Sequence, residues 1–495
     1  AATGRSSFDL SSFDVTTALT GTNVATGIAE LDTILAGSLS ADIKAARDGD
    51  AINIETANIT TNQLTASASG ALGTVGSAID IDARLANVAP FVPGFSGAAS
   101  VAGRLTQAEN NRIAVALSAA GPGGARATID GNTAIDASDL DLSIDGAAPL
   151  GLLNRFLEPR SLAGDVAFAL RLTGAPALDN LSGRVTSSNA RLVAPAVGIT
   201  LDNTTLNLTL ADARATLSAA TNVSSGGRIG AEGGLSLLGD FDADLDIRLN
   251  DVVLSDPRLY ETQINGTVSV NGPLAGGARI SGDLALDETN VRIPSSGFGG
   301  AGAIPEIIHI NEPPPVRRTR DRAGLLEKEA DAGSKAGPVF PLDIAIAAPN
   351  RLFVRGRGLD SEFGGSLRIG GTTANVIPQG AFNLIRGRLD ILGQRLALEE
   401  ATVTIQGSFI PVLRIRATTD ADDVSVAVIV AGPADNPEIT FTSDPDLPQE
   451  EVLARLLFGR ELESLSPIQA GRLALAVRTL AGQGGEGIIS NVRDG

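Results

Sequence analysis

Hydrophobic and polar residues alternate at every second position over most of the chain. In the segment Asp244–Leu249, Leu245, Ile247 and Leu249 share one side, and charged residues separate them. Because successive side chains of a strand point to opposite faces, this period predicts β-strands with one apolar face. The same pattern gives further candidates for that face: Val166, Phe168, Leu170, Leu206, Leu208, Val424, Val426 and Val428.

The strand pattern continues for more than 400 residues, with no obvious domain break before Pro294. Glycine (57 residues) and proline (24) punctuate it, as expected of many short strands joined by turns. Aromatic residues make up only 3% of the chain, so the large side chains that fill thick cores are scarce. We therefore predict an all-β fold, an elongated, folded-over, solenoid-like sheet with an apolar lumen. Some 25 strands would extend over roughly 120 Å. A set of ordinary β-sandwiches is the alternative.

One stretch departs from this pattern. Residues 294–340 combine glycines, the triplet Pro313–Pro315 and mixed charges, which indicates a flexible linker or loop. The triplet could also be a docking motif, although a stiff spacer is the simpler interpretation. The predicted organisation is a β-rich body over 1–293, this linker, a continuation of the body over 341–442, and helices with a tail over 443–495.

A helical pattern follows the strands at Ser443–Gly459. Pro448 and two glutamates suit the first turn of a helix, and Gly459 ends it. Leu453, Leu456 and Leu457 form most of its apolar stripe, so we predict that they cap the end of the β body or dock a partner. Further helices are predicted at 466–480 and, more weakly, at 151–157.

Side chains suited to catalysis are scarce. The chain has no cysteine, and its single histidine, His309, falls in the predicted linker. Carboxylates recur at Asp139, Asp141 and Asp145 and again at residues 242–246, an arrangement that calcium sites and glycan-cleaving β-helices use. On the polar face of a strand such carboxylates are more simply a solvated surface. We predict no enzyme, no metal and no cofactor.

The formal net charge of −19 disfavours nucleic acid and direct adhesion to an anionic membrane. The remaining feature is the apolar face, which is either a closed core or an open groove. An open groove of this length would need an apolar ligand. Acyl chains fit this requirement, because exposing a sixteen-carbon chain to water costs about 12 kcal/mol.

Three stretches of the C-terminal third resemble the TamB family of translocation and assembly module subunits, within the wider AsmA-like group. They are NRLFVRGRGLDSEFGGSLRIGG (350–371), FNLIRGRLDILGQRLALEEATVTIQGS (382–408) and SDPDLPQEEVLARLLFGRELESLSPIQAGRLA (443–474). Their order and spacing are specific to that family. Residues 1–293 are compatible with the β-rich central region of the family.

The resemblance implies a protein of the Gram-negative envelope that spans the periplasm. It implies a "β-taco" with an apolar lumen, and an N-terminal anchor in the inner membrane that we expect upstream of Ala1. It also implies two roles: conduction of phospholipids to the outer membrane, or assembly of outer-membrane and secreted proteins with the barrel protein TamA. A passive scaffold or stalk is a third possibility. The resemblance also implies that terminal strands beyond Gly495 engage the partner in full-length family members. The preferred lipid, the direction of movement, its energy source and the oligomeric state have no signature in the sequence.

Overall fold

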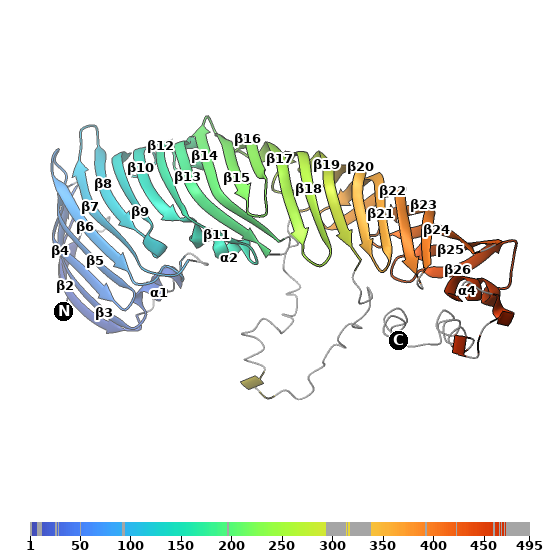
Figure 1. The fold of residues 1–495 in the computed structure, drawn as a ribbon. Coiled ribbons are helices and arrows are strands. Elements are labelled where there is room, and N and C mark those ends of the chain that lie inside the picture. Colours follow the sequence, from blue (N-terminus) through green and yellow to red (C-terminus); the bar gives the residue numbers. More distant parts are fainter. Residues whose placement is uncertain are drawn as a thin grey trace. The chain divides into compact units, whose positions relative to one another are not determined.

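A computed structural model describes two compact units, residues 1–248 and 249–495. Within residues 2–471, the description omits the short segments 7–11, 25–26, 28, 50, 92–94, 196–197, 314, 392–393, 422, 459–460, 465, 467 and 470, and the longer segments 294–312 and 317–337. Both units consist mainly of β-strands, which are drawn as arrows in Figure 1. Each unit is described by itself below.

The first unit contains strands separated mostly by tight turns, with a few short helices inserted between them. Its elements are β1 (Ala2–Ser6), β2 (Ser12–Thr22), α1 (Ala29–Leu35), β3 (Ser38–Asp48), β4 (Ala51–Thr61), β5 (Leu64–Leu72), β6 (Ala78–Leu85), β7 (Ala99–Gln107), β8 (Arg112–Ala120), η1 (Pro122–Gly124), β9 (Arg126–Ala134), β10 (Leu140–Pro149), η2 (Leu150–Leu153), α2 (Asn154–Leu157), β11 (Ser161–Ala163), β12 (Asp165–Gly174), η3 (Leu178–Asn180), β13 (Leu181–Ala194), β14 (Ile199–Ala211), β15 (Arg214–Val223) and β16 (Arg228–Ser236).

Strands of the first unit pair antiparallel with their neighbours in chain order from β1 to β10, and again from β12 to β16. Strand β10 continues the ladder by pairing with β12, while short β11 pairs with β13. Figure 1 shows these strands side by side along a curved sheet, with α1 and α2 at the ends of strands. The helical turn predicted at 151–157 is present as η2 and α2.

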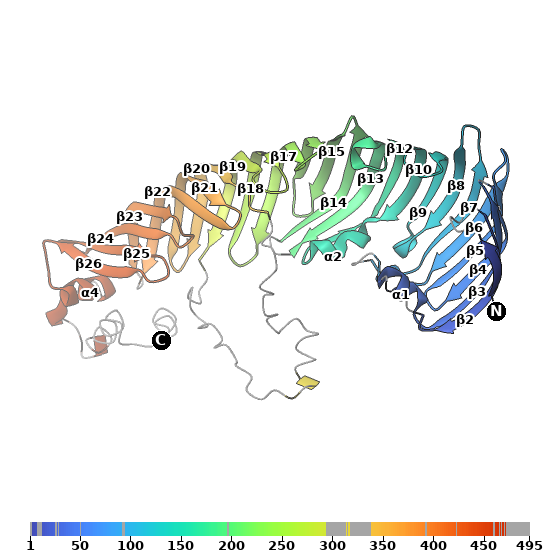
Figure 2. The same ribbon diagram turned by 180° about the vertical axis from the view of Figure 1, so that it is seen from behind.

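Strand β17 (Asp242–Asp256) crosses the division between the units. The second unit then contains β18 (Tyr260–Pro273), β19 (Arg279–Arg292), β20 (Leu342–Gly356), β21 (Leu359–Thr372), β22 (Asn375–Ile391), β23 (Gln394–Gln406), β24 (Val412–Ala421), β25 (Val424–Pro433), β26 (Glu438–Asp444), α4 (Gln449–Phe458) and η5 (Leu462–Ser464). The strands again pair in chain order. Figure 2 shows this unit from behind, with α4 at the end of the strands.

The predicted linker interrupts the chain without interrupting the sheet. Strand β19 ends at Arg292 and β20 begins at Leu342, yet the two strands pair directly and in parallel from Ile280↔Leu342 onwards. Apart from Pro313, Pro315 and Val316, residues 294–337 lie outside the described residues, and so does His309. The compact units divide at residues 248 and 249, inside a strand and well before the linker.

Irregular pairing at several places bends the strands, and buried hydroxyl groups lie at these bends. At the shift between β14 and β15, Asn203 has a φ of +52°, and buried Thr221 shares a 2.8 Å hydrogen bond with Thr204. At the shift between β18 and β19, buried Thr262 and Thr289 share a hydrogen bond of 2.7 Å. Each pair satisfies hydroxyls that would be costly to bury alone.

The prediction of an all-β fold built on an elongated, folded-over sheet is confirmed. The described strands join into one sheet, so the alternative of separate β-sandwiches is wrong. The sheet is open in each unit, because the described strands at its ends do not pair with one another. Helix α4 agrees with the helix predicted between Pro448 and Gly459. The second helix, predicted at 466–480, lies almost entirely outside the described residues.

Candidate functional site

An apolar row crosses the sheet of the first unit from β3 to β16. In antiparallel pairs, residues directly opposite each other point to the same face, so the register traces one row across many strands. Following the pairs from strand to strand, every member is apolar or glycine: Ile43, Ala57, Ala68, Ile81, Gly103, Leu117, Ile129, Ile144, Leu170, Gly183, Leu210, Ala215 and Leu235.

A neighbouring row brings together two of the predicted residues that lie far apart in the sequence. Phe168 of β12 faces Val185 of β13, which faces Leu208 of β14, and Leu208 faces Leu217 of β15. We call the face that carries these two rows the apolar face. Over thirteen strands at about 4.8 Å each, it extends for roughly 60 Å within the first unit.

Most side chains of the apolar face are only partly buried, although Leu210 and Ala215 are buried. Val166, Phe168 and Leu170 are half-buried and alternate with exposed residues of β12. The same alternation holds for Leu206 and Leu208 in β14. Leu245, Ile247 and Leu249 also follow it in β17. A second sheet packed on this face would bury such side chains almost completely, as in a sandwich core.

The opposite face of the first unit carries charges that pair with one another. Arg104 and Asp80 lie on adjacent strands with 2.7 Å between nitrogen and oxygen, and the hydrogen bond from Arg104 lowers the pKa of the Asp80 carboxyl. Asp141 pairs with Arg171 at 2.8 Å and Asp139 with Arg112 at 2.6 Å. The predicted carboxylate ladder thus includes ion-paired surface groups, and the described residues contain no group of three or more ligands that could hold a metal ion.

The apolar surface at the end of the second unit is covered by α4. Val424, Val426 and Val428 of β25 are almost fully buried in one cluster with Leu453 and Leu456 of α4. The sequence predicts the three valines on an open apolar strip, but the helix lies over them and removes them from it. Leu457 packs partly buried at the margin of the same cluster. Helix α4 therefore covers the face of the last strands.

An arginine in α4 ties the helix to the sheet. The Arg455 side chain, 11% exposed, contacts Glu451 at 3.0 Å, Glu461 at 3.1 Å and Asp423 in the turn between β24 and β25 at 3.0 Å. The hydrogen bond to Glu451, followed by that to Asp423, raises the pKa of the Arg455 guanidinium above its ordinary value. These contacts fix the helix on the strands in addition to its apolar packing.

Comparison with known proteins agrees with this architecture. The sequence model of the TamB C-terminal domain matches residues 214–495, more than half of the chain. The chain belongs to the TamB family. A relative named "Translocation and assembly module subunit TamB", from Haemophilus influenzae, is 30% identical over 151 residues. This match covers 29% of the chain and 12% of that relative, so the chain spans only a small part of the relative's length.

The TamB match includes all of the second unit and the strands that lead into it. It confirms the family that the three motifs indicated. Among the described residues, no helix of this TamB family member is long and apolar enough to cross a membrane.

Two features of the site were not singled out from the sequence. Glycines such as Gly183 lie in the apolar row, where a side chain would collide with the carbonyl of Ala169 on the neighbouring strand. A glycine inside an alternating strand was the available signal for such close backbone approach. Arg455 was overlooked because its partners Asp423 and Glu461 become neighbours only in the fold.

Proposed function

We propose that the chain conducts phospholipid acyl chains along its apolar face, as part of a bridge between the inner and outer membranes of a Gram-negative envelope. The observation that supports this is the apolar face of the first unit, which is continuous in register from β3 to β16. Most of its side chains are partly exposed; Leu210 and Ala215 are buried. The surface under α4 is an internal comparison, because there the same kind of residues are almost fully buried.

A long apolar surface that stays partly exposed is expected to bind an apolar ligand. An acyl chain suits it because the two rows of the face consist of aliphatic residues, Phe168 and glycines, which require no directional contacts such as hydrogen bonds from the ligand. Each methylene group that leaves water on such a face contributes about 0.8 kcal/mol. The charged residues of the opposite face are ion-paired and exposed, which suits solvent contact.

Photo-crosslinking in cells tests this proposal. A photoreactive residue at Leu208, on the apolar face, should capture phospholipid, whereas one at Asn207, the exposed neighbour in β14, should not. Ile247 and Asp246 give a second matched pair in β17. Equal capture from both faces, or no lipid at either apolar position, contradicts conduction along this face.

A charge placed on the apolar face separates an open conduit from a closed core. Ile247→Arg should leave the protein folded if the face is open, because the long side chain can reach solvent along it, yet lipid passage should fall. In a closed core the same change would bury an unpaired charge and unfold the region. Strand circular dichroism and phospholipid transfer, measured on the same variant, distinguish these outcomes.

The second candidate function is assembly of outer-membrane or secreted proteins together with the barrel protein TamA. It is favoured by the name of the Haemophilus relative, a subunit of a translocation and assembly module. It is also favoured by β26, which among the described strands pairs only with β25 and so leaves one edge for an added strand. In this case, a cysteine placed in β26 and a cysteine placed in a client strand should form a disulfide crosslink. The crosslink should form only at those positions that an added strand would bring opposite each other. Under either function, we propose that the chain carries out no catalytic step. We also propose that an N-terminal anchor attaches it to the inner membrane.

A further inference from the structure

The two rims of the second unit differ in charge. One rim, which we call the uncharged rim, consists of the turns at 273–278, 338–341, 372–375, 407–411 and 433–437. These turns lie at one end of the strands, because β19 and β20 start there in parallel, and β20 to β26 then alternate in direction. Among their residues, Asp435 is the only charged one.

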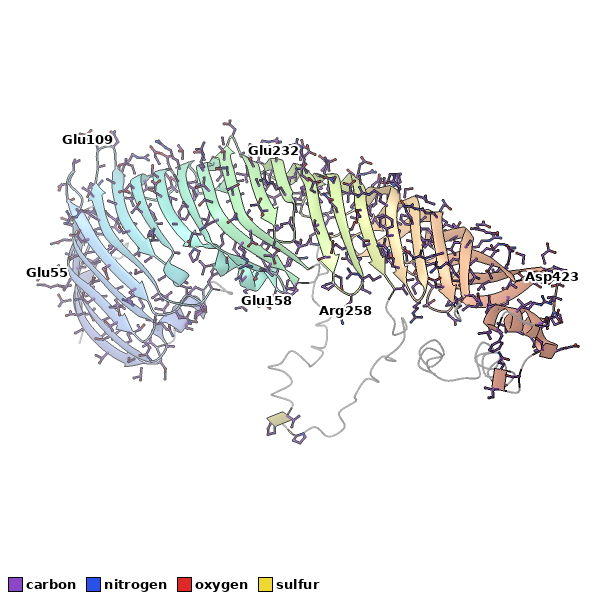
Figure 3. All side chains as sticks on the ribbon, viewed as in Figure 1. Glu55, Glu109, Glu158, Glu232, Arg258 and Asp423 are labelled. Atoms are coloured by element: carbon purple, nitrogen blue, oxygen red, sulfur yellow. The ribbon has the colours of Figure 1, made fainter. Side chains whose placement is uncertain are left out.

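The rim at the other strand ends is charged. Its turns carry Arg258 between β17 and β18, Arg357 between β20 and β21, and Asp423 between β24 and β25. Arg258 and Asp423 are labelled in Figure 3, where their side chains lie at strand ends. The difference between the rims is therefore a property of several turns on each side.

The uncharged rim also exposes bulky apolar side chains. Phe409 is 63% exposed and Ile410 is 49% exposed, side by side at the turn between β23 and β24, and Val412 follows at 45%. Val339 and Ile377 add exposed apolar surface beside neighbouring turns. Large apolar side chains that project from a turn cannot be buried by their own sheet, so they are available to another apolar phase.

Hydrogen bonds hold this turn in place. The Ser408 hydroxyl accepts a hydrogen bond from the backbone N–H of Ile410 at 3.2 Å. The backbone N–H of Gly407 donates to the Pro378 carbonyl at 2.8 Å, and that of Ala434 donates to the Pro411 carbonyl at 2.9 Å. The turn is thus joined to the strands on both sides, so that its apolar side chains are presented by a fixed framework.

Cationic groups lie behind the uncharged rim. Arg414 is exposed two residues after Val412 on the same side of β24, which sets it back by about 7 Å. Arg279 and Arg368 both pair with Asp343, and the hydrogen bond from Arg279 lowers the pKa of the Asp343 carboxyl. An apolar edge with arginine behind it matches a lipid leaflet, in which acyl chains lie beneath a layer of phosphates.

We infer that the turn Gly407–Val412 inserts into a phospholipid bilayer, with Phe409 and Ile410 among the acyl chains and Arg414 at the level of the phosphates. This inference rests on the proposed function. It adds to that function the place at which a lipid leaflet contacts the second unit. Because the inserted turn is uncharged, attachment depends on apolar contact and changes little with salt concentration. The net charge of −19 agrees with attachment that does not rely on anionic lipids.

The chain contains no tryptophan, so a single one introduced at the turn reports on that position alone. In the full chain, Phe409→Trp should shift its fluorescence to shorter wavelength with vesicles of phosphatidylethanolamine and phosphatidylglycerol. Acyl chains labelled with bromine should quench it. Ile385→Trp is the matched control, because Ile385 is 50% exposed in the middle of β22, away from both rims, and its fluorescence should stay unchanged.

Flotation with the same vesicles measures attachment itself. The double variant Phe409→Ser with Ile410→Ser should reduce the bound fraction by about tenfold or more, whereas Ile385→Ser should not reduce it. The inference is overturned if tryptophan at 409 stays in a water-like environment with vesicles. It is also overturned if the fluorescence shift grows with protein concentration without vesicles, which would indicate a second copy of the chain. Capture of lipid at Leu208 is independent of both results, so this inference and the proposed function can fail separately.

Discussion

Leu456 determines how firmly α4 covers the end of the sheet. Its side chain is 1% exposed and packs in the cluster with Val424, Val426 and Val428, all of them nearly inaccessible to solvent. Leu456→Ala leaves a cavity there. Because the strand side of the cluster is held by sheet hydrogen bonds, the cavity cannot collapse fully, and we expect a loss of about 3 kcal/mol. The contacts of Arg455 remain, so that α4 stays docked but opens more often.

Hydrogen exchange is the suitable assay, because a chain with two compact units is not expected to unfold in one step. A loss of about 3 kcal/mol in the local opening free energy raises the exchange of α4 amides on the order of 100-fold. Amides of β12 in the first unit should be unaffected. Ile385→Ala, at an exposed position, is the control that should leave α4 unchanged. Exchange of α4 that is already fast in the wild type and unaltered by Leu456→Ala would refute the reasoning, because the helix would then not be docked.

Two further predictions concern the second unit. The pKa of the Asp343 carboxyl is lowered in the fold, chiefly by the hydrogen bond from Arg279. The ionised carboxylate therefore stabilises the fold at pH values above its unfolded pKa, and this stabilisation is lost as the pH falls through the folded pKa. Opening of β20 amides, measured by hydrogen exchange, should therefore be constant from about pH 7 to 5 and rise below about pH 4, and Asp343→Asn should remove that dependence. Deleting residues 312–335 should leave the strand signal in circular dichroism intact, because β19, before this segment, pairs directly with β20, after it. Loss of that signal would show that the segment is needed to form the β19–β20 pair.

Local sequence patterns were sufficient to predict the fold class and the two faces of each strand. Alternation at every second residue identified Phe168, Leu208 and Ile247 as residues on the apolar side of their own strands, because the strand's geometry imposes that period whatever the strand pairs with. It also identified α4, whose proline, glutamates and apolar stripe are local signals. The motifs of the C-terminal third indicated the TamB family, which the match to residues 214–495 confirmed.

The sequence pattern did not predict which apolar residues are covered by another element of the fold. Val426 and Leu208 belong to the same kind of alternating segment, yet one is buried beneath α4 and the other stays partly exposed on the open sheet. Burial depends on which element packs on a face, and a strand's own sequence does not specify that. The pairing of β19 with β20 and the grouping of uncharged turns at one rim likewise depend on contacts between residues far apart in the chain. Such contacts follow from strand direction and register, which only the assembled sheet fixes.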